Sequence, residues 1–279
     1  MTIAEKYCKQ MEMTMKIQIV YLATGGYKNY AEQFIGSVKY FAPDADKYIT
    51  IISDGLQEYD GYSDEYIKGI NVVHIFDMIY PTININKSLF INSVMMDDAD
   101  YVFNIDADSQ FKNVPNYDWN RLFNVMDDGF IIVPRHPCYL LYDDAIFQGI
   151  PKHKWIQNFF TTNLTERNPI RASYIPDDEY LYVNSALWAG KHDVMINFDN
   201  KIIELTKKDL TRYPNGYHIP MFMDENYVNK ITNDYLKGNS REFKIDVQPY
   251  TTFYNFDAIP CDLVFLYQKN MKDFKFGRQ

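Results

Sequence analysis

The sequence predicts an α/β fold with a mixed open sheet, and three observations support this. Apolar segments of strand length, rich in β-branched residues, recur along the 279-residue chain. Segments with apolar residues at helical spacing lie between them, which is typical of strands joined by crossover helices. Hydrophobic residues make up 47% of the chain, enough to fill a sizeable core. We therefore expect residues 16–279 to form one domain, preceded by a leader helix or disordered tail at 1–15.

The first half of the chain shows this alternation best. Phe34, Val38 and Phe41 recur at helical spacing, and a second helix is expected to run through Leu89 and Val94. Strands flank both helices. They are expected at residues 16–24, 48–54, 71–76 and 101–106.

The second half contains fewer clear elements. Phe198, Ile202 and Leu205 lie on one face of an expected helix. The segments expected to form strands are 129–134 and 263–267, and loops rich in Asn, Pro and Asp are expected at 112–118 and 213–220.

Composition argues against several classes of partner. The net charge of −9 disfavours nucleic acid, because a nucleic-acid binder needs a basic face to displace counterions. No segment approaches the roughly 20 apolar residues that cross a bilayer. Cys8, Cys138 and Cys261 are odd in number and share no metal-ligand or redox spacing, which fits reduced thiols in a cytosol. We expect a soluble cytoplasmic protein.

The triplet Asp-Ala-Asp occurs three times, at Asp44/Asp46, Asp98/Asp100 and Asp106/Asp108. With 37 acidic residues in the chain, a bare triplet is weak information. The first copy follows a proline in a turn and the second lies in a polar link, so both are expected to be solvated charges. Only the third closes an apolar strand, and ligands of open α/β sheets gather at the carboxyl ends of strands.

Asp106 and Asp108 are therefore the candidate metal ligands. Residues two apart in an extended segment point to the same side, so both carboxylates can face one cation. With diphosphate oxygens and water they would complete an octahedral site for Mn²⁺ or Mg²⁺. The alternative is an Asx-type turn at the end of the strand.

Six segments, taken in order, resemble motifs of one enzyme family. They are YLATGGY (21–27), IISD (51–54), YVFNIDADSQF (101–111), RHPCY (135–139), TERNPIRASYIP (165–176) and MDENYVNK (223–230). The family is the family 6 retaining glycosyltransferases, which includes the blood-group A and B transferases and α-1,3-galactosyltransferase. The resemblance implies a GT-A-type single domain, with a Rossmann-like nucleotide-binding half at 16–110 and an acceptor-binding half at 111–279.

The implied reaction moves galactose, N-acetylgalactosamine or a related hexose from a UDP-sugar to an oligosaccharide or other glycan acceptor, forming an α-linkage. In that reading Ala23, Thr24 and Tyr27 hold uracil and ribose. A metal on Asp106 and Asp108 neutralises the charge on the departing UDP. The basic residues that match the family's phosphate-side positions are Lys87, Lys269, Lys272 and Arg278. Each lysine taken alone is more often a solvated surface charge.

Asp224 and Glu225 form a second carboxylate pair, at the start of an expected helix. The resemblance makes Glu225 the nucleophile, or the group that stabilises positive charge on the sugar face opposite the leaving nucleotide. It assigns Asp224 to the sugar hydroxyls. The alternative is an acidic pair favoured by the helix dipole alone.

Other positions depart from the family pattern. Met223 stands where the family has His before Asp-Glu, and Asn184, Ser185 and Ala186 replace an x-Gly-Gly run of the donor pocket. His136 keeps a plausible acceptor position, although a lone His is more often structural. Two other functions stay open: a UDP- or sugar-binding protein on the same scaffold that has lost turnover, and a metal-dependent nucleotidyltransferase.

Overall fold

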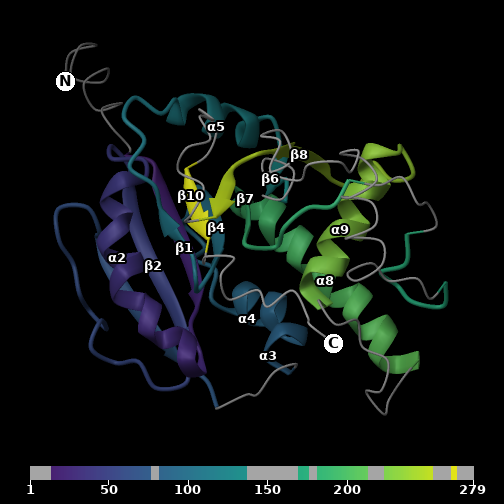
Figure 1. The fold of residues 1–279 in the computed structure, drawn as a ribbon, viewed down its shortest axis with the longest axis horizontal. Helices are drawn as coiled ribbons and strands as arrows, with labels where there is room; N and C mark the ends of the chain where they lie inside the picture. Colours follow the sequence, from purple (N-terminus) through teal and green to yellow (C-terminus); the bar gives the residue numbers. More distant parts are fainter. Residues whose placement is uncertain are drawn as a thin grey trace, which may run out of the picture.

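A seven-stranded mixed sheet organises the chain (Figure 1). The computed structural model describes residues 14–76, 82–136, 169–175, 181–212, 223–253 and 265–268. The strands of the large sheet, in chain order, are β1 (Lys16–Leu22), β2 (Asp46–Ser53), β3 (Gly69–His74), β4 (Tyr101–Asp106), β6 (Phe130–Pro134), β7 (Leu187–Lys191) and β8 (Lys244–Gln248). A small second sheet contains β5 (Gln110–Phe111), β9 (Thr251–Phe253) and β10 (Leu266–Gln268).

Helices connect and cover these strands. The described helices are α2 (Ala31–Ser37), α3 (Thr82–Ile85), α4 (Lys87–Ser93), α5 (Trp119–Asp127), α8 (His192–Arg212) and α9 (Met223–Leu236). Two short 3₁₀ segments, η1 (Gly25–Tyr30) and η2 (Val38–Tyr40), flank α2.

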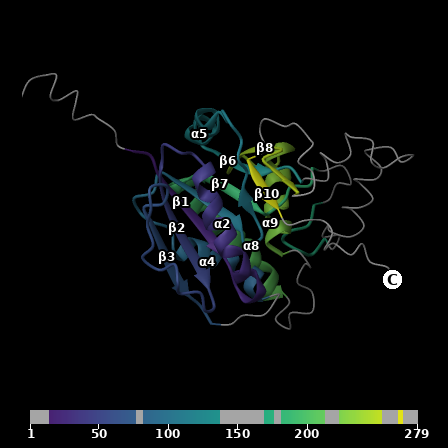
Figure 2. The same ribbon diagram turned by 60° about the vertical axis from the view of Figure 1, so that its left-hand side comes forward.

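The strand order β3-β2-β1-β4-β7-β6-β8 places a reversal of chain connection at β1. β1 pairs in parallel with β2 on one side and with β4 on the other, and β3 extends the parallel part (Figure 2). β7 is antiparallel to both of its neighbours, and β8 is parallel to β6. The carboxyl ends of β1 and β4 therefore flank a topological switch point, which is where open α/β sheets bind ligands.

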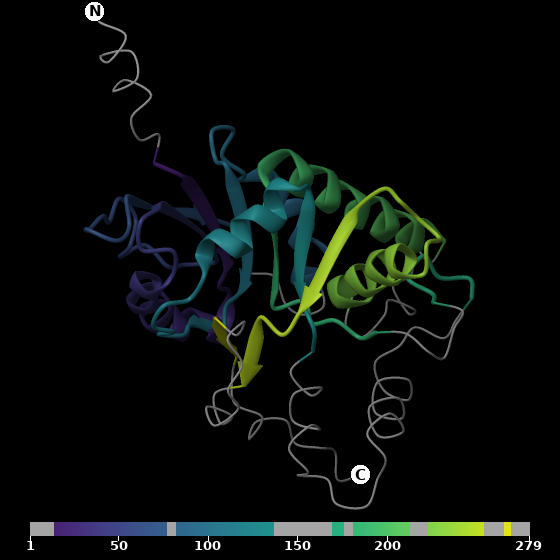
Figure 3. The same cartoon turned by 90° about the horizontal axis from the view of Figure 1, so that it is seen from above.

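Helices cover both faces of the sheet. Along β1, Ile19 and Tyr21 point to the face covered by α2 and α5, whereas Val20 points to the face covered by α4, α8 and α9. On the first face Tyr21 stacks on Phe34 of α2, with ring centroids 4.2 Å apart. On the second face α8 and α9 lie side by side next to β8 (Figure 3). The strands are buried on both sides, which explains their nearly continuous apolar sequence.

Most of the expected elements are confirmed. β1, β2, β3, β4 and β6 match the expected strands to within two residues at each end, and α8 contains the expected apolar face. α2 and α4 also lie where helices are expected, but they are shorter: Val38 falls in η2, Phe41 follows it, and α4 ends one residue before Val94. The segment 112–118 is a loop, as expected. Of the expected strand at 263–267, Leu266 and Tyr267 belong to β10, and Phe265 directly precedes it. The expected loop at 213–220 lies outside the described residues.

The sheet also contains strands that the apolar pattern did not indicate. β7 is short and includes Gly190, and β8 alternates with polar and charged residues because it is an edge strand. The helix α5 was missed as well, although Asp118 caps it by accepting a hydrogen bond from the backbone N–H of Arg121 (3.1 Å). Since β6, β7 and β8 extend the sheet begun by β1 to β4, one sheet crosses the expected boundary between the two halves at residue 110.

The first two acidic triplets lie at the amino ends of the parallel strands, whereas the third lies at the carboxyl end of β4. Asp98 and Asp100 are exposed, and both contact Lys16 at the start of β1. Asp44 is also exposed, whereas Asp46 begins β2 and pairs with an exposed lysine, Lys68. The expectation of solvated charges is confirmed for the three exposed residues, and Asp46 is partly buried.

No helix in the described part of the chain is both long enough and apolar enough to cross a membrane. The three cysteines and residues 1–13 of the expected leader lie outside the described residues.

Candidate functional site

Lys87 is the centre of a buried ionic cluster at the carboxyl end of β4. Its Nζ donates to Oδ1 of Asp106 (2.5 Å), to Oδ2 of Asp224 (3.1 Å) and to the carbonyl oxygen of Ser185 (3.4 Å). The residue is only 4% exposed. One lysine at the start of α4 thereby joins the end of β4, the first turn of α9 and the segment before β7. The expectation of a solvated surface charge is wrong for Lys87.

The surroundings of Lys87 explain why it can stay charged there. Burial alone would lower its pKa, but the negative charges of Asp106 and Asp224 outweigh burial and raise the pKa above its ordinary value. Its Nζ also lies 4.5 Å from the ring centroid of Trp188, a cation–π contact. A buried charge of this kind needs all of its partners, because a lone buried ion is costly.

Glu225 lies beside this cluster and has partners of its own. Its Oε2 accepts from the backbone N–H of Ser185 (3.2 Å) and from the Ser185 hydroxyl (3.3 Å), and its Oε1 accepts from the Tyr182 hydroxyl. Burial raises the pKa of Glu225 to about 7, and the negative charges of Asp224 and Asp106 add to this rise. The hydrogen bonds from Tyr182 and Ser185 lower the pKa and offset part of it. Glu225 therefore changes its charge near neutral pH, as acid–base and nucleophilic groups in active sites often do.

Two asparagines on α9 hold the extended segment that carries Tyr182 and Ser185. Asn233 accepts from the backbone N–H of Leu181 (3.0 Å) and donates to its carbonyl oxygen (2.9 Å). Asn229 pairs with Val183 in the same way (2.8 and 2.9 Å). Each side-chain amide thus satisfies both backbone groups of one residue, as a neighbouring strand would.

The spacing of this ladder brings Ser185 to Glu225. Four residues of α-helix rise about 6 Å, and two residues of extended chain span about 6.6 Å. The two spacings therefore match, and every second residue of the extended segment lies opposite every fourth residue of the helix: 181 opposite 233, 183 opposite 229 and 185 opposite 225. At the third position a carboxylate replaces the amide, and a carboxylate can only accept. The carbonyl oxygen of Ser185 is left to Lys87, which links the ladder to the ionic cluster.

Asp106 leaves β4 in a turn, but its side chain does not cap that turn. The backbone N–H of Ser109 donates to the Asp106 carbonyl oxygen (3.0 Å), while the Asp106 carboxylate accepts from Lys87. The Asx-turn alternative is therefore wrong for Asp106. Its side chain is 35% exposed, which makes it more open than Lys87 or Asp224. Asp108, two residues on, is also partly exposed.

The donor atoms around Asp106 suit a hard divalent cation in type and charge. Asp106, Asp108, Asp224 and Glu225 carry more negative charge than Lys87 can balance, and carboxylate oxygens are what Mg²⁺ and Mn²⁺ prefer. Within the described residues only Oδ1 of Asp106 accepts a hydrogen bond, so Oδ2 is available to a cation. No group of three or more His, Cys, Asp or Glu side chains in that part of the chain could hold a metal by itself. A cation bound by Asp106 and Asp108 would therefore take its other ligands from a substrate and water.

The predicted nucleotide-side residues lie across the switch point, after β1. Ala23 is fully buried, and its backbone N–H donates to the carbonyl oxygen of Ile52 (2.9 Å). Thr24 is partly exposed, and Tyr27 is 50% exposed. Asp54 fixes the turn between them, because its carboxylate accepts from the backbone N–H of Gly25 (3.1 Å). Gly25 has a φ of +54°, a conformation that favours glycine.

The predicted acceptor-side and donor-pocket residues contact the segment 182–186, whose Tyr182 and Ser185 donate to Glu225, or belong to it. The backbone N–H of His136 donates to the carbonyl oxygen of Tyr182 (3.4 Å), and the ring centroids of the two residues lie 5.6 Å apart. Burial lowers the pKa of His136, so its ring is neutral. Asn184 and Ala186 are buried, and the backbone N–H of Ala186 donates to Oδ1 of Asn184 (2.6 Å). The carbonyl oxygen of Ala186 accepts from the backbone N–H of Asp106 (3.0 Å). These hydrogen bonds fix the backbone at the carboxyl end of β4. Lys269, Lys272 and Arg278 lie outside the described residues.

A second buried carboxylate lies behind the Lys87 cluster. Asp199 of α8 is fully buried near Ser88 and Trp188, yet its oxygens, the Ser88 hydroxyl and the Trp188 indole N–H form no hydrogen bond among the described residues. Burial raises the pKa of Asp199 from 3.8 to about 7, and the positive charge of Lys87 offsets part of this rise.

Asp199→Asn is expected to stabilise the protein at neutral pH but not at pH 4. In the folded wild type the protonated carboxyl is favoured. Its stabilising contribution is full below pH 3.8 and is lost as the pH rises to about 7. The free energy of unfolding of Asp199→Asn should exceed that of wild type by an amount that grows from pH 3.8 to about pH 7. For roughly three pKa units this difference reaches about 4 kcal/mol. Urea unfolding at pH 4, 6 and 8 measures it, with the exposed Asp97→Asn as control. A difference that does not vary with pH would contradict the prediction.

The sequence matches no protein-family model and no curated protein. A function for this chain therefore has to come from the chemistry of its own residues.

Proposed function

We propose that the chain is a retaining glycosyltransferase of GT-A-type fold, in family 6 or close to it. It moves galactose, N-acetylgalactosamine or a related hexose from a UDP-sugar to a glycan acceptor and forms an α-linkage. The observation that carries the proposal is the meeting of Lys87, Asp106 and Asp224 beside Glu225. These residues come from three distant segments, and each stands at a position that the resemblance assigns to handling the donor.

The location of the cluster supports a nucleotide-sugar ligand. It lies where β1 and β4 end at the topological switch point, and the strand order 3-2-1-4 is that of the first four strands of a Rossmann-like fold. Thr24 and Tyr27 follow β1, while Asp106 ends β4. A nucleotide lying along the ends of these two strands would place its diphosphate near Asp106 and its uridine near Tyr27.

Glu225 has the chemistry that a retaining transfer needs. One carboxylate on the sugar face opposite the leaving UDP either attacks C1 or stabilises positive charge that builds on the ring. With a pKa of about 7, Glu225 is largely ionised just above neutrality. The acceptor hydroxyl can give its proton to the departing diphosphate, so a single carboxylate suffices. The serine and tyrosine that bond Glu225 hold it in one orientation.

Lys87 acts mainly by positioning Asp106 and Asp224, since it already contacts both carboxylates. Asp224 is then held where it can accept hydrogen bonds from sugar hydroxyls. A Mn²⁺ or Mg²⁺ ion on Asp106 and Asp108, when bound, would neutralise the charge that develops on the leaving UDP.

A second candidate is a UDP- or sugar-binding protein without turnover. The observation that favours it is that both oxygens of Glu225 already accept hydrogen bonds from the protein, which lowers the nucleophilicity of a carboxylate. It predicts binding of UDP with no cleavage of the donor. The nucleotidyltransferase alternative gains no support, because it leaves the surroundings of Glu225 unexplained.

Release of UDP from a panel of UDP-sugars tests the proposal, with Mn²⁺ or EDTA and with or without simple galactosides. We expect slow, metal-dependent release from one or two donors even without an acceptor, and faster release with a suitable galactoside. Silence across the panel while UDP still binds would exclude the transferase and favour the binding protein.

A further inference from the structure

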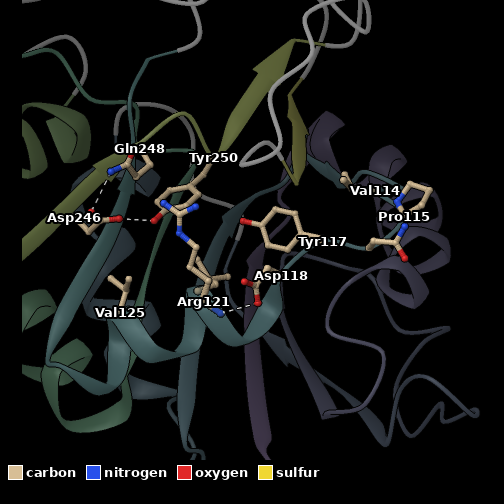
Figure 4. Close-up of a pocket in the computed structure, with 11 residues that line it drawn as sticks. Val114, Pro115, Tyr117, Asp118, Arg121, Val125, Asp246, Gln248 and Tyr250 are labelled. Carbon is tan, nitrogen blue, oxygen red and sulfur yellow. Dashed lines mark hydrogen bonds between the residues drawn. The ribbon is translucent and has the colours of Figure 1, made fainter.

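A pocket lies on the α5 face of the sheet, at the carboxyl end of β8 (Figure 4). Its volume is about 360 Å³, within the roughly 300–1,000 Å³ of small-ligand pockets. Leu122 and Val125 of α5 give it an apolar wall. Tyr117, Arg121 and Tyr250 supply polar groups, and Figure 4 shows the Tyr117 hydroxyl and the Arg121 side chain directed toward Tyr250.

The acidic groups of this pocket are held in place by the protein. Asp246 accepts from the Tyr250 hydroxyl and, at 3.4 Å, from the side-chain amide of Gln248. Asp118 caps α5 by accepting from the backbone N–H of Arg121. Burial and the charge of Asp246 raise the pKa of Tyr250, so its hydroxyl stays protonated. The pocket therefore presents fixed acceptors beside the donors of one exposed arginine.

The charges of the lining select against an anionic ligand. One cation, Arg121, stands against two carboxylates, Asp118 and Asp246, so a phosphate or a nucleotide would meet net negative charge. A neutral ligand with several hydroxyl groups fits better. Hydroxyls can pair with Arg121 and Asp246, and the apolar face of a sugar ring can lie against Leu122 and Val125.

We propose that this pocket binds a neutral sugar unit and is an outer subsite for the carbohydrate acceptor. The proposed acceptor residue His136 is close to the pocket along the backbone: it follows Arg135, whose backbone N–H donates to the carbonyl oxygen of the pocket residue Gln248 (2.8 Å). Binding of a saccharide stands on the pocket alone. Its assignment to the acceptor rests on the proposed function.

Saturation-transfer NMR on the full chain, without UDP or metal, tests binding directly. The probes are methyl β-galactoside, methyl β-glucoside and methyl N-acetyl-β-glucosaminide. At least one should bind saturably, and Arg121→Ala should weaken it about tenfold, the loss of one charge-assisted hydrogen bond. The control is Arg241→Ala, an exposed arginine before β8, which should bind as wild type does.

The outcomes separate the two proposals. Saccharide binding that depends on Arg121, in a protein that releases no UDP from any donor, would support the pocket and remove its role in transfer. UDP release with no binding of the three glycosides would overturn the pocket. Equal binding by wild type and Arg121→Ala would overturn it as well, provided that thermal melting shows both proteins folded.

Discussion

Glu225→Gln is expected to lower both donor hydrolysis and sugar transfer by roughly 10²- to 10³-fold, a loss typical of removing one group that stabilises transition-state charge. The amide keeps the shape of the side chain: its oxygen can accept from Ser185, and its NH2 can donate to the Tyr182 hydroxyl oxygen. The fold and the affinity for the UDP-sugar should therefore change little. Initial rates at saturating donor, with donor affinity measured separately by calorimetry, check this. Glu204→Gln, an exposed carboxylate of α8, is the control.

The pH dependence gives a second test of Glu225. Its ionised form is the active one and its pKa is about 7, so the wild-type rate should rise between about pH 6 and 8 and then level off. The residual rate of Glu225→Gln should lack this rise. Loss of donor binding with an unchanged rate at saturation would make Glu225 a binding residue instead.

Asp108→Asn is expected to abolish stimulation by Mn²⁺ with little effect on the free energy of unfolding, because Asp108 is partly exposed and lies outside the Lys87 cluster. Asp106→Asn should remove the same stimulation and also destabilise the fold. It leaves Lys87 with one carboxylate, Asp224. Breaking a fully buried pair costs about 3–5 kcal/mol. Asp106 is 35% exposed and Asp224 remains, so we expect about 1–2 kcal/mol.

Mn²⁺ binding in the presence of UDP, followed by electron paramagnetic resonance, gives a readout that does not depend on turnover. Both variants should bind Mn²⁺ far more weakly than wild type. Asp44→Asn should bind Mn²⁺ as wild type does, because Asp44 belongs to a triplet of identical sequence at the amino end of β2, away from the site. Full Mn²⁺ stimulation in the Asp106→Asn/Asp108→Asn double variant would contradict the metal site.

Much of the fold follows from local sequence. The strands β1, β2 and β4 are buried on both faces, so their apolar, β-branched residues leave a continuous signal. β8 gives no such signal because an edge strand alternates with polar residues. α5 is amphipathic and short, and Asp118 at its start was counted among loop residues. Its capping role depends on where the chain goes next.

The candidate site was only partly predictable. The apolar run that precedes Asp106 predicted its place at a strand end. The burial of Lys87, in contrast, depends on Asp224, which is 137 residues away along the chain. The ladder had a sequence signal that was not used. Glu225, Asn229 and Asn233 stand four residues apart on one helix face, and polar residues at that spacing indicate a polar partner along the helix. The partner segment 181–185 could not be predicted from the sequence, because it pairs through its backbone groups and any residue type can supply these.

The stereochemistry of donor hydrolysis tests retaining transfer at Glu225 most directly. Cleavage of an α-linked UDP-hexose in water, followed by proton NMR in the first minutes before mutarotation, shows which anomer of the free sugar forms first. We predict the α-anomer, and the same α-anomer at a much lower rate with Glu225→Gln. The β-anomer as first product would mean inversion and would contradict the role of Glu225. No hydrolysis of any UDP-sugar would contradict the transferase itself.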